Sequence, residues 1–138
     1  MTRSLPMTPR GILTAPLPAR RRRALAAIEA VVGLNAIGGM AYALGGAKDV
    51  PPEWLDGTPF DSYVLPGVYL GVVVGGSCLA AAFTAARDDH CARAAALASS
   101  AVMVSWIAAQ VAIIGYRSLL QPIIAATGLT VACLAAQR

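Results

Sequence analysis

The sequence predicts an all-α membrane protein: an antiparallel bundle of four transmembrane helices with the N- and C-termini in the cytoplasm. Three observations predict this fold class, and the first is composition. Hydrophobic residues make up 57% of the 138 residues and charged residues only 13%, whereas a soluble domain carries about 25% charged residues. The charged residues are also gathered in a few places, so they cannot form the polar surface that a soluble protein needs.

The second observation is a set of four apolar runs, each about 18 to 23 residues long. A hydrocarbon core about 30 Å thick needs about 20 helical residues, and about 17 to 25 are tolerated. Continuous apolar runs are typical of membrane helices, whereas barrel strands alternate between apolar and polar residues. The runs cover residues 24–46, 66–86, 94–116 and 119–136.

The third observation is the distribution of Lys and Arg along the chain. With the N-terminus inside, the outer segments hold only Lys48 and Arg117, and the other nine of the 11 lie on the cytoplasmic side. This bias follows the positive-inside rule, so we expect a multi-pass protein of the plasma membrane. The nine cytoplasmic residues are Arg3, Arg10, Arg20, Arg21, Arg22, Arg23, Arg87, Arg93 and Arg138.

Residues 1–23 are predicted to be a flexible cytoplasmic tail that precedes the membrane domain, residues 24–138. Prolines disfavour both helix and sheet, and this segment contains Pro6, Pro9, Pro16 and Pro18. Four consecutive arginines end the tail, and each attracts anionic headgroups by about 1 kcal/mol. We expect Arg20, Arg21, Arg22 and Arg23 to anchor the topology on such lipids, with specific lipid or partner recognition as the alternative.

The first apolar run has one competing interpretation. Arginines before it and the triplet Ala41-Tyr42-Ala43 after its centre imitate a secretory signal with a cleavage site. Both the run and the segment before it are long for a signal peptide, which favours a retained helix.

Residues 47–65 form the longest connection, on the outer side. Asp56-Gly57 and Thr58-Pro59 indicate turns. Trp54 and Phe60 are too apolar for a freely solvated linker, so we expect this loop to fold onto the outer mouth of the bundle. The other connections are short, which makes sequential helices antiparallel neighbours.

Small residues are expected to bring the helices together, because apolar helices gain no hydrophobic energy by associating in lipid. Gly67, Gly71 and Gly75 recur every four residues and form a glycine stripe on the second helix. We expect this stripe and a heptad seam on the third helix to pack within the chain, with a homo-oligomer or partner interface as the alternative. The seam residues are Ala94, Ala98, Ala101, Ser105, Ala108, Ala112 and Gly115, and Leu97, Val104, Ile107, Val111 and Ile114 on the opposite face suit lipid.

Glu29 is the acidic residue within the first apolar run, about 7 to 9 Å inside its inner edge. Charged groups in lipid are costly, so we expect a nearby arginine to neutralise it; Arg22, Arg23, Arg93 and Arg138 are the candidates. The alternative is a titrating carboxylate that couples protons to a cationic substrate.

Further polar residues lie deeper in the apolar runs. Asn35 is expected to make an interhelical hydrogen bond, with ligand binding as the alternative. Trp106, Gln110, Ile113 and Arg117 are predicted to fall on one stripe that leads to the outer face, and Trp106 is expected to lie inside the bundle. Ser118 and Gln121 match a capping box that starts the fourth helix.

Motifs of catalysis and nucleic-acid binding are absent from the sequence. His90 and Cys91 are too few for a metal site, and no C-x-x-C pair occurs. We therefore expect no enzymatic activity, no cofactor and no nucleic-acid partner. The leading hypothesis is a non-enzymatic accessory or scaffolding subunit; the alternative is a small proton-coupled transporter that uses Glu29.

Two segments carry a resemblance to a known group. These are Thr58-Pro59-Phe60-Asp61-Ser62-Tyr63-Val64-Leu65-Pro66-Gly67, and Trp106-Ile107-Ala108-Ala109-Gln110 with Ile114-Gly115. The chain resembles an uncharacterised family of small bacterial four-helix integral membrane proteins. The resemblance covers about residues 25 to 136 and implies a bacterial inner-membrane architecture without an assigned activity, with Phe60, Pro66 and Gln110 near the outer mouth.

Overall fold

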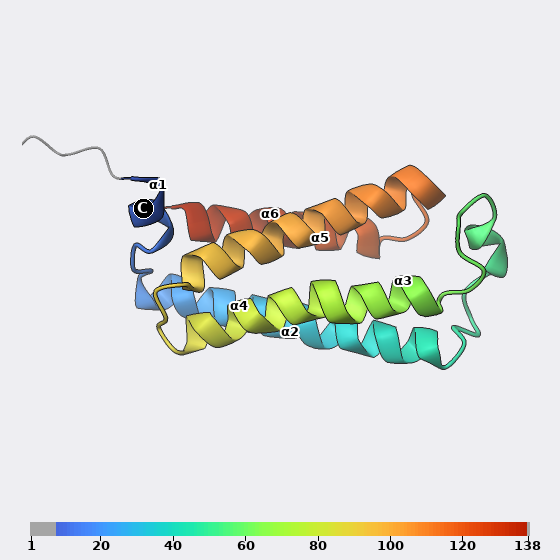
Figure 1. The fold of residues 1–138 in the computed structure, drawn as a ribbon, viewed down its shortest axis with the longest axis horizontal. Coiled ribbons are helices and arrows are strands. Elements are labelled where there is room, and N and C mark those ends of the chain that lie inside the picture. The colour runs from blue at the N-terminus through green and yellow to red at the C-terminus, as the bar shows by residue number, and fades with distance from the viewer. Residues whose placement is uncertain (1–7, 138) are drawn as a thin grey trace, which may run out of the picture.

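The computed structural model of the chain describes residues 8–137 and is helical, without a strand in that range. Long helices lie side by side with alternating direction (Figure 1). The helix from Val64 to Ala86 is continuous but consists of an α-helical, a π-helical and a second α-helical part. The elements are α1 (Pro9–Leu13), α2 (Ala19–Leu44), the 3₁₀ turn η1 (Pro52–Leu55), α3 (Val64–Tyr69), the π-helix η2 (Leu70–Gly75), α4 (Gly76–Ala86), α5 (Ala92–Ile114) and α6 (Leu120–Ala136).

Three helices are long and apolar enough to cross a membrane: Ala19–Leu44, Val64–Ala86 and Ala92–Ile114. Helix α6 is also apolar but has 17 residues. Between 22% and 33% of the most apolar window of each long helix is buried inside the protein. Large apolar side chains such as Val31 and Val72 therefore point outward, and a surface of that kind suits lipid rather than water.

The N-terminal segment is more ordered than the sequence predicted. Pro9 stands at the first position of α1, where its missing N–H costs nothing, and the Thr8 hydroxyl accepts a hydrogen bond from the Gly11 N–H at 3.3 Å. The expectation that prolines prevent helix before residue 20 is therefore wrong for residues 9–13. Helix α2 also begins at Ala19, so the four arginines belong to its first turns. Residues 1–7 and 138, among them Arg3, Pro6 and Arg138, lie outside the described residues.

Arginines at the end of the helices that holds the start of α2, named the inner end after the predicted topology, bind backbone carbonyls where helices end. Arg22 donates to the Ala85 carbonyl at 3.3 Å and lies 3.3 Å from the Asp88 carboxylate. Arg21 donates to the carbonyls of Leu134 and Gln137. The last carbonyls of a helix have no partner within it, and cations there also interact favourably with the helix dipole. These arginines therefore stabilise the ends of α4 and α6.

Arg93 is the most buried of the inner arginines, with 4% of its surface exposed. It donates to the carbonyls of Ala135, at the end of α6, and of Ala15, before α2. Leu17, which belongs to the connection between α1 and α2, is buried in the core. The segment between α1 and α2 is thus packed against the helices.

The glycine stripe lies against α2. A Cβ atom on Gly71 would lie 2.6 Å from the Cβ of Met40, and one on Gly67 would overlap the Cβ of Ala43. Real Cβ atoms do not approach so closely, so the two helices touch because these positions lack side chains. The glycine stripe packs within the chain.

The heptad seam on α5 does not pack within the chain, contrary to the prediction. Its central residues, from Ala98 to Ala112, are exposed. Of the face expected to suit lipid, Ile107 is buried instead, whereas Val111 is exposed. The buried residues of α5 are Ala92, Arg93, Ala96, Ser99, Ser100, Met103 and Ile107. The physical reason is volume, because Met103 and Ile107 fill space between the helices that alanines would leave empty. Ser100 brings α6 close instead, because its hydroxyl donates to the Gly128 carbonyl at 2.7 Å.

Candidate functional site

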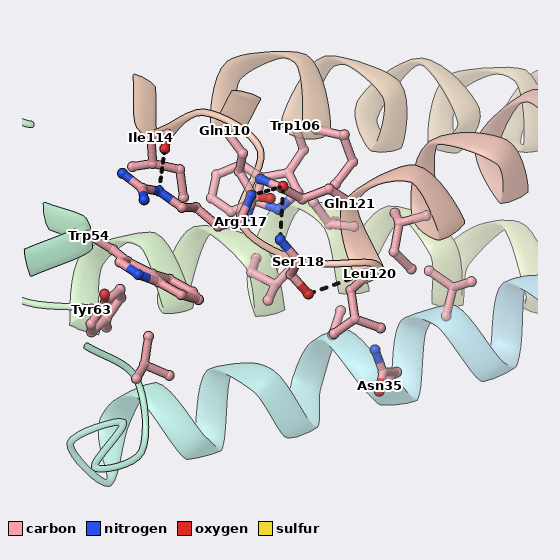
Figure 2. A pocket seen from close by; sticks show the side chains of 17 residues that line it. Asn35, Trp54, Tyr63, Trp106, Gln110, Ile114, Arg117, Ser118, Leu120 and Gln121 are labelled. Atoms are coloured by element: carbon pink, nitrogen blue, oxygen red, sulfur yellow. Dashed lines mark hydrogen bonds between the residues drawn. The ribbon is translucent and has the colours of Figure 1, made fainter. Parts of the chain in front are cut away.

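A cavity of about 450 Å³ opens at the end of the helices that carries the loop of residues 47–65, which is named the outer end after the predicted topology. Its walls come from α2, η2, α5, the α5–α6 turn, the start of α6 and the outer loop (Figure 2). Most of the lining is apolar, and the polar groups stand among apolar ones. The lining residues are Val32, Asn35, Ala36, Val50, Trp54, Tyr63, Leu70, Val74, Trp106, Ile107, Gln110, Ile114, Arg117, Ser118, Leu120, Gln121 and Ile124.

The outer loop supplies one wall of this cavity through Val50, Trp54 and Tyr63. The Tyr63 hydroxyl donates to the Pro51 carbonyl at 2.6 Å, which ties the start of α3 to η1. Partial burial, with the nearby Glu53 charge, raises the pKa of Tyr63, so the phenol remains a neutral donor. The loop therefore folds onto the outer mouth. Phe60, for which the resemblance implied the same place, does not line the cavity, and neither does Pro66.

Helix α5 contributes Trp106 and Gln110, one turn apart on the face that meets the cavity. The Trp106 indole stacks on the Tyr69 ring, with a centroid distance of 4.9 Å and an interplanar angle of 24°. Such offset stacks contribute about 0.5–1.5 kcal/mol beyond area burial. The stack fixes Trp106 half-buried between α5 and α3.

The α5–α6 turn places Arg117 at the rim of the cavity. Gly115 adopts φ +72°, which ends α5 sharply. Gln121, with 4% of its surface exposed, accepts from the Arg117 and Ser118 N–H groups at 2.8 and 3.3 Å. One of the two hydrogen bonds of a capping box is therefore present. The other is not formed, because the Ser118 hydroxyl accepts from the Leu120 N–H rather than from the Gln121 N–H. The Arg117 Nε donates to the Ile114 carbonyl at 2.8 Å.

Asn35 lies on α2 deeper than the rim residues. The predicted interhelical hydrogen bond is wrong: no residue in the described part of the chain bonds to its amide. The side chain instead borders both the cavity and a lateral groove of about 790 Å³ between α2 and α6. The reason is separation, since α2 packs mainly on the Val64–Ala86 helix and leaves α6 at a distance.

Glu29 lies apart from the cavity and is completely buried, with 0% of its surface exposed. Its Oε1 accepts a hydrogen bond from the Ser99 hydroxyl, and its Oε2 has no described partner. None of the arginines within residues 8–137 forms an ion pair with it, so the predicted neutralising partner is wrong for Arg22, Arg23 and Arg93. Arg22 and Arg93 bind helix-end carbonyls instead, and Arg23 is exposed.

An apolar layer separates Glu29 from the cavity. Val32, one helical turn further along α2, and Val74 on η2 form the cavity floor. Met103, one turn beyond Ser99 on α5, is completely buried at the same level. Sequence reasoning missed Ser99 as the partner of Glu29, although a hydroxyl at the matching depth of another apolar run was the available signal.

The inner loop brings together Asp89, His90 and Cys91, whose donor atoms all lie within 4.8 Å of one another. All three residues are exposed and adjacent in sequence. The Cys91 N–H donates to the Asp89 carboxylate at 2.8 Å and holds the pKa of Asp89 below its usual range. The turn that precedes α5 therefore explains why these three residues lie together.

Comparison of the chain with protein-family models, with curated proteins and with solved structures finds no match.

Proposed function

We propose that the chain is a four-pass protein of the plasma membrane with both termini in the cytoplasm. Helix α6, at 17 residues, spans about 26 Å and meets the lower limit of a membrane helix. Arginines lie at the start of α2, the end of α4 and the start of α5, which share one end of the molecule in Figure 1. The positive-inside rule places that end in the cytoplasm. Arg20 and Arg23 are exposed there and face anionic headgroups, whereas Arg21 and Arg22 bind carbonyls.

The two loops give a topology test within one chain. We expect an impermeant maleimide to label Asp56→Cys on intact cells, because residue 56 is exposed in the outer loop. The native Cys91, exposed in the inner loop, should react only after permeabilisation, with Cys133 replaced by serine in both experiments. The proposed orientation is wrong if Cys91 reacts first.

Within this topology we propose a non-enzymatic role as an accessory subunit that binds a transmembrane helix of a larger membrane protein. The observation that carries this proposal is the exposed seam on α5, namely Ala98, Ala101, Ser105, Ala108 and Ala112. Small side chains allow two membrane helices to approach closely. The glycine stripe is occupied by α2, whereas the seam is exposed and open to a partner helix.

A bulky substitution on the seam tests this role. Ala101→Leu is expected to reduce recovery of the partner at least tenfold in a native pull-down from mild detergent, because the leucine holds the helices apart. Ala80→Leu, on the exposed face of α4, is the matched control and should retain the partner. Recovery of wild type without a stoichiometric partner contradicts the subunit role, and so does equal recovery with both variants.

Glu29 supports a second candidate function, a small proton-coupled transporter. A buried carboxyl group with no described cation beside it is most stable as the neutral acid, because an isolated buried carboxylate is costly. Such a group is a functional candidate in a membrane protein. The apolar layer at Val32 and Val74 lies between this group and the outer cavity, which is the arrangement of an occluded proton site.

A further inference from the structure

The outer cavity contains two amides without an internal partner. Asn35 from α2 and Gln110 from α5 line it, and neither bonds to any residue that the structure describes. Asn35 is exposed and Gln110 is half-buried. A molecule that fills this mostly apolar cavity would remove both amides from water, at a cost of about 1–3 kcal/mol for each amide left unpaired. A ligand of this cavity must therefore supply hydrogen-bonding partners for them.

The rim of the cavity carries a positive charge. Arg117 is the charged residue among the described lining residues. Its Nε is bonded to Ile114, while its terminal nitrogens have no described acceptor and can bind a carboxylate or phosphate in a bidentate manner. The acidic residues of the outer loop do not line the cavity; they are Asp49, Glu53, Asp56 and Asp61.

The cavity is reached from the side of the protein. The groove between α2 and α6 shares Val32, Asn35, Leu120 and Ile124 with the cavity. The exposed apolar side chain of Ile123 also borders this groove. A molecule that is dissolved in the bilayer can therefore enter between the two helices.

We propose that this cavity binds an anionic amphiphile of the membrane, with a single apolar chain and a carboxylate or phosphate headgroup. The headgroup pairs with Arg117 at the rim, near Trp54 and Tyr63 at one end of the view in Figure 2, and Asn35 lies toward the other end. The apolar chain lies against Leu70 and Ile124. A volume of about 450 Å³ is within the usual range of about 300–1,000 Å³ for ligand sites. The proposal does not depend on the subunit role.

The two tryptophans of the chain give a direct readout, because both Trp54 and Trp106 line the cavity. The full chain is placed in phosphatidylcholine nanodiscs and titrated with dibrominated stearate, whose bromine atoms quench tryptophan on contact. We expect saturable quenching. Arg117→Gln should weaken it about tenfold, the effect of losing one charge-assisted pair, while the methyl ester of the same probe binds both proteins equally. Lys48→Gln, outside the cavity, should behave as wild type.

A second pair of variants separates the cavity from bulk lipid. Ile124→Phe extends a ring into the cavity and should abolish saturable quenching, whereas the outward Leu129→Phe should not. Gel filtration checks that both fold, and inorganic phosphate should not compete. Three results overturn the proposal. The first is quenching that rises linearly with probe concentration, and the second is an equal loss of binding for the acid and its ester in Arg117→Gln. The third is unchanged binding in a folded Ile124→Phe. Competition by phosphate alone identifies a soluble anion and overturns it also.

Discussion

Gly71→Ala is expected to destabilise the protein by about 1–3 kcal/mol, the usual range for forcing a methyl group into a filled contact. The added Cβ would lie 2.6 Å from the Met40 Cβ and 2.5 Å from its sulfur. The sulfur can move with the side chain, but the Cβ moves only with the backbone of α2. The two helices must therefore separate along the contact that holds the first half of the chain together.

Gly76→Ala is the matched control, because a Cβ there meets no atom within 4 Å. It should be neutral or slightly stabilising, since alanine favours helix over glycine by about 1 kcal/mol. The folded fraction of each variant during titration with sodium dodecyl sulfate gives the comparison. Met40→Gly removes the opposing Cβ, so the combination with Gly71→Ala should cost less than the sum of the single changes. Equal loss in Gly71→Ala and Gly76→Ala contradicts this packing.

Glu29→Lys is expected to prevent folding, whereas Glu29→Gln is expected to change stability by less than about 1 kcal/mol. The lysine would bury an ammonium group next to the Ser99 hydroxyl with no carboxylate to pair with, at a cost of several kcal/mol. The glutamine keeps an oxygen that accepts from Ser99 and removes no partner from any described arginine. Yield and thermal stability in detergent measure both effects.

The same glutamine variant decides between the two functions proposed above. A transporter loses proton flux in proteoliposomes when Glu29 becomes glutamine, although the protein still folds. A subunit has no flux to lose. A marked loss of stability in Glu29→Gln contradicts the packing described for Glu29 and restores an ionic partner as the explanation.

The sequence predicted the long helices well because the length of an apolar run is a local property. It predicted the start of α2 less well, because Arg20–Arg23 were assigned to a flexible tail. Arginine is a good helix former, and its carbonyl partners on α4 and α6 come from elsewhere in the chain. The partner of Glu29 was mistaken for the same reason, because arginines that satisfy helix ends are not available to a carboxylate.

The candidate site was partly visible in the sequence. Trp106 and Gln110 share a helical stripe, so spacing alone predicted that they lie together. The stripe was wrongly extended to Arg117, because α5 ends at Ile114 and the α5–α6 turn brings Arg117 to the cavity instead. Asn35 and the outer loop join them only through the packing of α2 against α3, which no local pattern records. The buried face of α5 was predicted on the wrong side because most of its residues are small, and the bulky Met103 and Ile107 decided the orientation.

The π-helical turn η2 sets the angular phase between the two ends of the second long helix. In an α-helix, four residues turn through about 400°, so residues spaced by four drift sideways by about 40° at each step. A π-helix takes more residues per turn. The sideways drift between Gly71 and Gly75 is therefore smaller, and both glycines stay against α2. Six residues of this wider turn advance the helix about as far as five residues of an α-helix, so Leu70–Gly75 hold one residue more than an α-helix needs for the same rotation. Loss of one residue from Leu70–Gly75 would therefore convert the turn to α-helix and leave α4 close to its present phase, with Cys78 still in the core. Loss of one residue from α4 before Cys78 has no such turn to absorb it and would rotate the rest of α4 by about 100°.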